Sequence, residues 1–336
     1  MSVVQERIEQ PLGSSSSAER PRRGASTLRR WLPLLGFGLL AWVLSRLDLH
    51  ALGRAVGRVT PLTLVLSCTY FTINAYLKVW RWQRLLKAQG IVLPHRVALA
   101  SFFNALFYAQ ITIGRVGEFL RIEALTERGV RPGTALSSCV FDRLLDVLWV
   151  LFSGLVLGVL WLGDLRIALV VGVVLIGLFI GGTALLALFG RDDSPALSSR
   201  FAQSRWGKRI VGFTHELASG IRPMLRPRAL AEAALWTVVA WYFYFAALFV
   251  LSDGLHIAVP RLLLTATAAF AALTSLLPVT ISGLGAREVI YIEVLRSHGV
   301  PSETAVAVSL LHLAVMTAMA IGLGLCGVAW RARQRK

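Results

Sequence analysis

Eight long apolar segments constrain the fold of this chain more than any other feature. Several exceed the roughly 18 residues that identify a transmembrane helix. Soluble domains are about 45–50% apolar, whereas 56% of this chain is hydrophobic. A membrane β-barrel would instead show alternating segments of about ten residues. We therefore predict an all-α polytopic membrane protein. The apolar segments are 31–49, 61–80, 97–113, 134–162, 166–189, 229–251, 262–280 and 303–330.

The two ends of the chain are polar and basic. Residues 1–30 contain the low-complexity stretch "GSSSSAERPRRGAS", which is too polar to bury a core and is expected to be disordered. No clear A-x-A cleavage site accompanies the first apolar segment, so we predict that Trp31–Leu49 is retained as a helix. Residues 331–336 form a second basic tail. The net charge of +17 is expected to reflect topology and anionic headgroups, not nucleic acid.

The distribution of Lys and Arg decides between two topologies. If all eight segments crossed, the basic N-terminal tail and the basic segment 190–228 would lie on opposite sides of the membrane. Cytoplasmic loops should carry the excess of positive charge. If 97–113 and 262–280 instead enter and turn back, both tails, segment 190–228, and the stretches Arg81–Arg96 and Arg115–Arg131 all become cytoplasmic. We therefore predict six full spans plus two re-entrant hairpins in a bacterial inner membrane, with both termini in the cytoplasm.

The two halves of the chain match at a constant offset. Glu288 lies 170 residues after Glu118, and at this offset whole apolar segments fall on one another. We predict a first membrane repeat at 31–162 and a second at 163–330, which includes an amphipathic cytoplasmic helix near 203–222. Because the first unit begins inside and the second outside, the repeat is inverted, as is typical of transporters.

The first predicted hairpin ends in "ITIGRVGEFLR", residues 111–121. Gly117 permits a tight turn, and a helix is expected to begin near Glu118. The unpaired amides of such a helix start, together with Arg115 and Arg121, would attract an anion such as a lipid phosphate. Arginine is also suited to bidentate phosphate contact.

The second predicted hairpin ends in "VTISGLGAREVI", residues 279–290. Arg287 supplies the charge here, and Glu288 follows it directly. The turn residues are expected to be Ser282, Gly283 and Gly285. The two clusters thus repeat the same combination of glycine, arginine and glutamate.

Two interpretations of the glutamates stay open. Glu118 and Arg121 are three residues apart, so they share a helix face and can form a structural ion pair. Glu288 can likewise pair with Arg287, or bind a proton for coupling. An ionisable residue at mid-depth costs roughly 2.5–3.5 kcal/mol, which makes each a candidate for a role in a site.

The segment at 134–162 opens with "SSCVFDRLLDVLW", which carries three more charges. Asp142 and Asp146 lie on one helix face, with Arg143 beside them. They form either an interfacial cluster that reaches toward water or part of a polar cavity beside the first hairpin. His312 falls opposite Asp142 at the repeat offset and is either packed or functional.

Enzyme signatures are absent from the sequence: it contains no G-x-S-x-G, no H-E-x-x-H and no P-loop. Three scattered cysteines, Cys68, Cys139 and Cys326, provide neither a disulfide framework nor metal-ligand spacing. We therefore expect no enzymatic activity, no cofactor and no metal site.

The charged motifs resemble those of a flippase-like membrane family that includes the transmembrane region of lysylphosphatidylglycerol synthases. The similar stretches are "GRVGEFLR" at 114–121, "FDRLLD" at 141–146 and "PVTISGLGAREVI" at 278–290, and the resemblance spans roughly 31–330. The resemblance implies movement of a lipid between leaflets, with some members linked to glycolipid or polyprenyl-lipid pathways. The residues that it would place at the functional core are Gly117, Glu118, Arg121, Asp142, Arg143, Gly283, Gly285, Arg287 and Glu288.

Full-length synthases continue into a soluble aminoacyl-transferase domain, whereas this sequence stops at Lys336, so lysine transfer to a lipid is not expected of it. The leading hypothesis is a flippase or scramblase for a phospholipid or a polyprenyl or glycolipid phosphate. Its partners would be membrane lipids with anionic headgroups. The alternatives are a small-anion transporter and a non-transporting partner of a lipid-modifying or glycosyltransferase enzyme.

Overall fold

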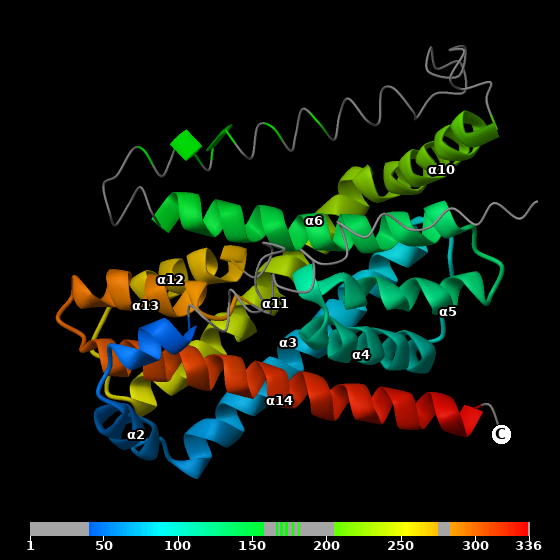
Figure 1. Ribbon diagram of the computed structural model, residues 1–336. Coiled ribbons are helices and arrows are strands. Elements are labelled where there is room, and N and C mark those ends of the chain that lie inside the picture. The colour runs from blue at the N-terminus through cyan, green and yellow to red at the C-terminus, as the bar shows by residue number, and fades with distance from the viewer. Residues whose placement is uncertain are drawn as a thin grey trace, which may run out of the picture.

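The computed structural model describes residues 40–157, 205–274 and 283–334, together with isolated positions between 166 and 181. Within these residues all regular secondary structure is helical (Figure 1), as the sequence predicts. Among the described helices, three are long and apolar enough to span a membrane. They are α3 (Pro61–Ala88), α11 (Pro227–Gly254) and the Ser302–Trp330 part of α14 (Ser302–Gln334). The protein is therefore a helical membrane protein.

The remaining elements are shorter or carry more charge. They are α2 (Leu49–Gly57), α4 (His95–Ile111), the 3-10 helix η1 (Ile113–Ile122), α5 (Glu123–Thr126), α6 (Pro132–Leu157), α10 (Arg205–Ile221), the 3-10 turn η3 (Arg222–Leu225), α12 (Arg261–Thr274) and α13 (Ala286–Arg296).

The helix predicted at Trp31–Leu49 is shorter at its C-terminal end than expected. Residues 40–45 are helical, but the chain then bends, and Asp48 begins a new helix, α2, by accepting hydrogen bonds from the amides of His50 and Ala51. The part of the prediction before residue 40 lies outside the described residues, as do residues 1–30 and most of 166–189.

Helices α3 and α11 pack against each other in antiparallel orientation and form the centre of the molecule. Ser67 Oγ donates to the carbonyl of Ala247 at 3.1 Å, and Asn74 Nδ2 donates to that of Ala240 at 2.6 Å. Small residues and interhelical hydrogen bonds of this kind allow close approach between membrane helices. Since the partner numbers fall on α11 as they rise on α3, the two helices run in opposite directions.

The chain reverses direction twice between long helices. Helix α4 packs against η1, which follows it directly, and α12 packs against α13, with residues 275–282 between them outside the described part. Helix α4 has 17 residues and extends about 25 Å, which falls short of the roughly 30 Å hydrocarbon core of a bilayer. The described part of α12 has 14 residues.

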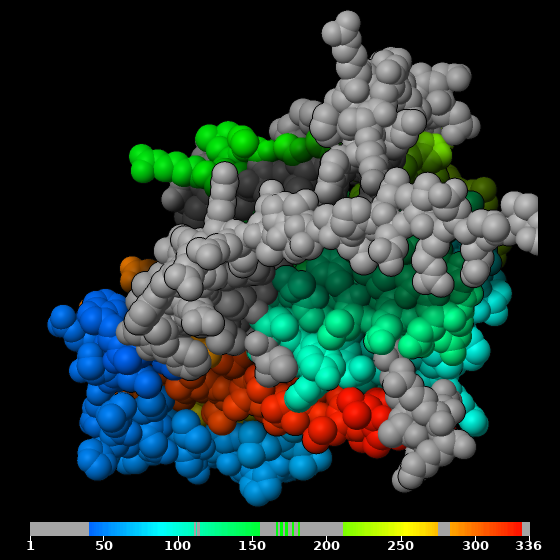
Figure 2. All heavy atoms as spheres, turned by 45° about the vertical axis from the view of Figure 1, so that its right-hand side comes forward, coloured from blue at the N-terminus to red at the C-terminus, as the bar shows by residue number. Residues whose placement is uncertain are grey.

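The contacts between elements are the same in both halves of the chain. Helix α14 packs on α4, and α6 packs on α12; η1 packs on α6, and α13 packs on α14. Figure 2 shows the first of these contacts, where the red surface of α14 borders the teal surface of α4 and η1. Consequently, the interior between α3 and α11 is enclosed by elements of both halves.

Gln89, at the end of α3, fixes one end of the molecule. Its Nε2 donates to Ser137 Oγ at 2.7 Å, to the carbonyl of Gly220 at 2.9 Å and to that of Thr134 at 3.4 Å. The end of α3, the start of α6 and the end of α10 therefore meet at one point. Helix α10, which falls within the predicted amphipathic segment 203–222, packs along α6.

Candidate functional site

Thr112 and Gly117 close the tip of the first hairpin. The Thr112 hydroxyl donates to the carbonyl of Tyr108 at 2.8 Å and accepts the amide of Gly117 at 2.8 Å. A Cβ at Gly117 would lie within 3.0 Å of the backbone of Tyr108 and Ala109. Glycine is thus required for close approach of the two arms. The expected helix start near Glu118 is wrong, because a 3-10 helix already begins at Ile113.

Arg115 projects from this tip with a left-handed backbone, at a φ of 57°. Its Nε donates to Glu118 Oε1 at 2.7 Å, and Arg143 on α6 donates to the same carboxylate at 3.1 Å. The three side chains are 13–24% exposed, so they lie at the accessible edge of the site. Glu118 therefore joins the hairpin to α6.

Arg121 lies deeper and does not pair with Glu118 as predicted. Its NH2 lies 2.9 Å from Asp142 Oδ2, and its Nε lies 3.1 Å from Cys139 Sγ. The guanidinium is also 5.1 Å from the Trp82 ring centre and 5.0 Å from that of Phe102. The i,i+3 interaction is lost because a buried carboxylate on α6 provides a better-enclosed partner.

Arg81 is a buried member of the site, although the predicted topology placed this residue in a cytoplasmic stretch. Its side chain is fully enclosed and lies 2.8 Å from Asp142 and 2.9 Å from Asp146. Lys78, one turn away, is 3.0 Å from Asp146, and Trp241 Nε1 donates to Asp146 at 2.9 Å. Asp142 and Asp146 thus belong to a network buried inside the protein.

The second hairpin tip is held by Glu288, whose side chain is fully buried. Gly285, with a φ of 84°, donates its amide to Glu288 Oε2 at 2.7 Å, and Ser309 Oγ donates to Oε1 at 2.9 Å. Arg287 Nε donates to Ser309 Oγ at 3.0 Å and is 3.6 Å from Glu288. Gly283 has a φ of 79°, as a tight turn requires. Ser282 lies outside the described residues.

His312, on α14, is packed in the interior of the protein. Its side chain is fully buried, and its ring makes an edge contact with Tyr244 at 4.9 Å between centroids. Neither ring nitrogen has a hydrogen-bond partner among the described residues. The structure therefore places His312 in an aromatic contact beside the site.

A cavity of about 100 Å³ lies where the two hairpins approach α3, α6 and α11. Five cationic side chains and three carboxylates line it among the described residues, which leaves an excess of two positive charges. Arg81 and Glu288, just behind its wall, cancel each other. The charged lining residues are Lys78, Arg115, Glu118, Arg121, Asp142, Arg143, Asp146 and Arg287.

The cavity brings together most of the predicted site residues, and three residues in or just behind its wall were not predicted. Arg115, Glu118, Arg121, Asp142, Arg143 and Arg287 line it, while Gly117, Gly283, Gly285 and Glu288 shape the two tips. The residues that were missed are Lys78, Arg81 and Trp241. The sequence did contain an indication of the two cations. Lys78 and Arg81 lie at i and i+3 near the end of α3, and this spacing complements the carboxylates at i and i+4 on α6.

The excess of positive charge in the cavity is chemically suited to an anion. Within the described residues, no group of three or more His, Cys, Asp or Glu side chains is placed to hold a metal ion. Each carboxylate is engaged by a cation or by hydrogen-bond donors, whereas Arg115 and Arg143 share one carboxylate at the accessible edge. An incoming anion would therefore meet cations that are only half neutralised.

Comparison with known proteins gives one family. The family model described as "Lysylphosphatidylglycerol synthase TM region" matches residues 31–324, which include every charged residue of the cavity. Among curated proteins, none matches the chain.

Proposed function

From the premise that the chain belongs to the lysylphosphatidylglycerol synthase transmembrane-region family, we propose that it moves an anionic lipid between the two leaflets of a bacterial inner membrane. The observation that carries the proposal is the cavity itself, which has an excess of two positive charges and is lined from both halves of the chain. A lipid phosphate is the anion that a membrane protein of a lipid-linked family meets at highest concentration.

The size of the cavity fits a headgroup and not a whole lipid. Its volume of about 100 Å³ is well below the roughly 300–1,000 Å³ of pockets that enclose drug-sized ligands. The phosphate would therefore enter between the hairpins while the acyl chains stay in the bilayer. Desolvation of the phosphate is offset by arginine contacts, which are strongest when bidentate.

Arg115 and Arg143 are the best placed to receive the phosphate first. They are 13% and 24% exposed and share Glu118. Arg121 is 4% exposed and already engaged by Asp142, so we assign it to positioning the network. Arg287 reaches the same cavity from the second hairpin and would take over the phosphate on the opposite side.

Three observations support the two re-entrant hairpins. Helix α4, with 17 residues, is at the lower limit of the length that crosses a bilayer. Helices α4 and α12 each pack against the element that follows. In addition, Gln89 before the first hairpin contacts Thr134 after it, so the chain would enter and leave on the same side. Eight crossings would place residues 89 and 134 on opposite sides.

The symmetry of the contacts supports an inverted repeat. Exchanging α3, α4, η1 and α6 for α11, α12, α13 and α14 leaves the pattern of packing unchanged. Because α3 and α11 are antiparallel, a twofold axis that exchanges them must lie perpendicular to both. If both helices cross the membrane, this axis lies in the membrane plane, which is the arrangement that supports alternating access.

The test is a lipid translocation assay on purified protein in liposomes. A membrane-impermeant quencher reaches the half of the fluorescent phosphatidylglycerol that lies in the outer leaflet. Quenching of more than this half requires that the protein move the lipid from the inner leaflet. We expect Arg115→Ala with Arg143→Ala to slow this at least 10-fold, since each lost charged hydrogen bond contributes about 1.5–3 kcal/mol. Arg54→Ala, on the exposed face of α2, is the matched control and should leave the rate unchanged.

Two outcomes would reject lipid translocation, and a third would reject the cavity as its path. No acceleration by the wild-type protein with any labelled lipid would refute it. Uptake of inorganic phosphate into the liposome interior without lipid movement would indicate a small-anion transporter instead. An equal rate in the wild type and the double variant would show that the cavity is not the path.

A further inference from the structure

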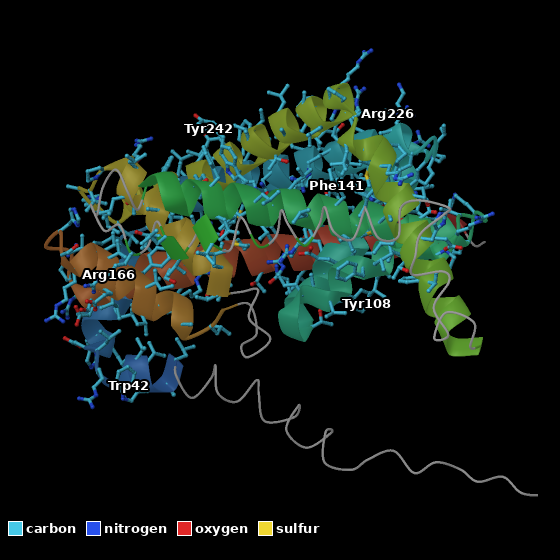
Figure 3. The ribbon with its side chains drawn as sticks, turned by 90° about the horizontal axis from the view of Figure 1, so that it is seen from above. Trp42, Tyr108, Phe141, Arg166, Arg226 and Tyr242 are labelled. Carbon is cyan, nitrogen blue, oxygen red and sulfur yellow. The ribbon has the colours of Figure 1, made fainter. Side chains whose placement is uncertain are left out.

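A second group of cations lies outside the cavity, at one end of the central helix pair. Arg84 and Lys87 come from the last turns of α3, and Arg226 and Arg228 flank the start of α11. Together they line a surface groove of about 320 Å³. Figure 3 shows Arg226 on the far side of the molecule from Trp42. The other residues of the groove are Ala88, Pro223, Ala229 and Glu232.

The groove is poorly neutralised. Its single carboxylate, Glu232, lies 3.9 Å from Arg84 and 3.6 Å from Arg228. Among the described residues, neither Lys87 nor Arg226 has a carboxylate partner within ion-pair distance. Four cations against one carboxylate leave an excess of three positive charges, which is larger than the excess in the central cavity.

Aromatic side chains place this groove at the level of lipid headgroups. Trp80 and Trp236 lie one turn further into the helix pair and make an edge contact at 6.3 Å. The Arg84 guanidinium stands 4.9 Å from the Trp80 ring centre. Tryptophan concentrates at the boundary between hydrocarbon and headgroups, and basic residues lie just beyond it. Since α3 and α11 are both candidate spans, the groove lies where two neighbouring helices leave the apolar layer together.

We propose that this groove is a second binding site, which holds the phosphate of an anionic phospholipid of the adjacent leaflet. Lys87 and Arg226 would contact the phosphate, since neither has a carboxylate partner in the described part of the chain, and Arg84 and Arg228 would complete its surroundings. Trp80 and Trp236 would pack against the upper part of the acyl chains. The site is separate from the cavity, and the proposal holds whether or not the protein moves lipids.

The location distinguishes a lipid from a soluble anion. A soluble anion would gain no binding energy from tryptophans that lie one turn below the groove. A phospholipid would gain both the charge contacts and the aromatic surface. Each cation removed should weaken binding by about 5-fold, so the loss of two should weaken it by about 25-fold.

The experiment measures phosphatidylglycerol bound to purified protein in phosphatidylcholine nanodiscs, by native mass spectrometry across a titration of phosphatidylglycerol. Lys87→Ala with Arg226→Ala should lose one tightly bound phosphatidylglycerol. Arg54→Ala with Arg58→Ala, on exposed positions of α2, makes the same change in net charge and should retain it. In an Arg115→Ala background, Lys87→Ala with Arg226→Ala should still remove one bound phosphatidylglycerol, which separates this site from the cavity.

A gain-of-binding variant guards against misfolding. Glu232→Gln removes the only carboxylate that lines the groove among the described residues. It should raise the affinity for phosphatidylglycerol several-fold, a change that a damaged protein would not show. Unchanged phosphatidylglycerol binding in the Lys87, Arg226 double variant would overturn the proposal. Displacement of the lipid by an equal concentration of inorganic phosphate would overturn it too, because the groove would then be a site for soluble anions.

Discussion

Asp142 is predicted to be the carboxylate on which the stability of the membrane core depends most. It is 4% exposed, and its oxygens lie 2.8 Å from Arg81 and 2.9 Å from Arg121. The surrounding network contains three cations and two carboxylates once Lys78 and Asp146 are counted. Asp142→Asn would raise its net charge from one to two and leave two buried guanidinium groups under-compensated. Breaking a buried ion pair on one side costs about 3–5 kcal/mol, and we expect a loss in this range.

Glu232 offers a matched control for this experiment. It also lies between two arginines, Arg84 and Arg228, but at 3.9 and 3.6 Å and with 38% of its side chain exposed. Exposed ion pairs contribute about 0–1 kcal/mol, so Glu232→Gln should barely change stability. The measurement is the free energy of unfolding in mixed micelles titrated with SDS, followed by circular dichroism.

A second-site variant tests the cause of the effect. If the loss in Asp142→Asn comes from an orphaned charge, Arg121→Met should recover part of it in the double variant, since methionine can fill the space between Trp82 and Phe102. The reasoning is refuted if Asp142→Asn lies within 1 kcal/mol of the wild type, or if Arg121→Met adds to the damage.

Further predictions concern the two hairpins. Gly117→Ala should destabilise the protein by about 1–3 kcal/mol because its Cβ meets the backbone of Tyr108, whereas Gly53→Ala, in open space on α2, should stabilise it by about 0.5–1 kcal/mol; thermal unfolding compares them. Val92→Cys and Glu127→Cys, made in a background without the native cysteines, should react with an impermeant maleimide from the same side of the membrane, and labelling from opposite sides would contradict a re-entrant first hairpin. Glu288→Gln should cost about 1.5–3 kcal/mol, since one amide cannot replace both charge-assisted hydrogen bonds from Gly285 and Ser309; a wild-type unfolding midpoint would speak against this role.

Hydropathy was sufficient to locate the central helices because they are long and continuously apolar. The predicted segments 61–80 and 229–251 lie within α3 and α11. The predicted end at residue 80 was too early for a physical reason. The segment stops where Arg81 begins a charged stretch, but Asp142 and Asp146 neutralise Arg81 from another helix, so α3 continues to Ala88.

The candidate site was only partly predictable, because its partners are distant in sequence. The glycine and charge motifs correctly indicated residues that come together around a cavity. The predicted pairing of Glu118 with Arg121 is replaced because Arg115 and Arg143 engage Glu118, while Asp142 on α6 engages Arg121. Lys78 and Arg81 were missed because a single sequence does not show which cation faces which carboxylate across a helix interface.

The left-handed backbone of Arg115 implies that folding stability and the charge of the cavity favour different residues at the hairpin tip. An L-residue with a side chain pays roughly 1–2 kcal/mol for this conformation, and glycine does not. Arg115→Gly would therefore relax the turn while removing a cation from the cavity edge. Glycine would give the more stable protein at this position. Arginine therefore lowers the stability of the fold while it supplies a cation to the edge of the cavity.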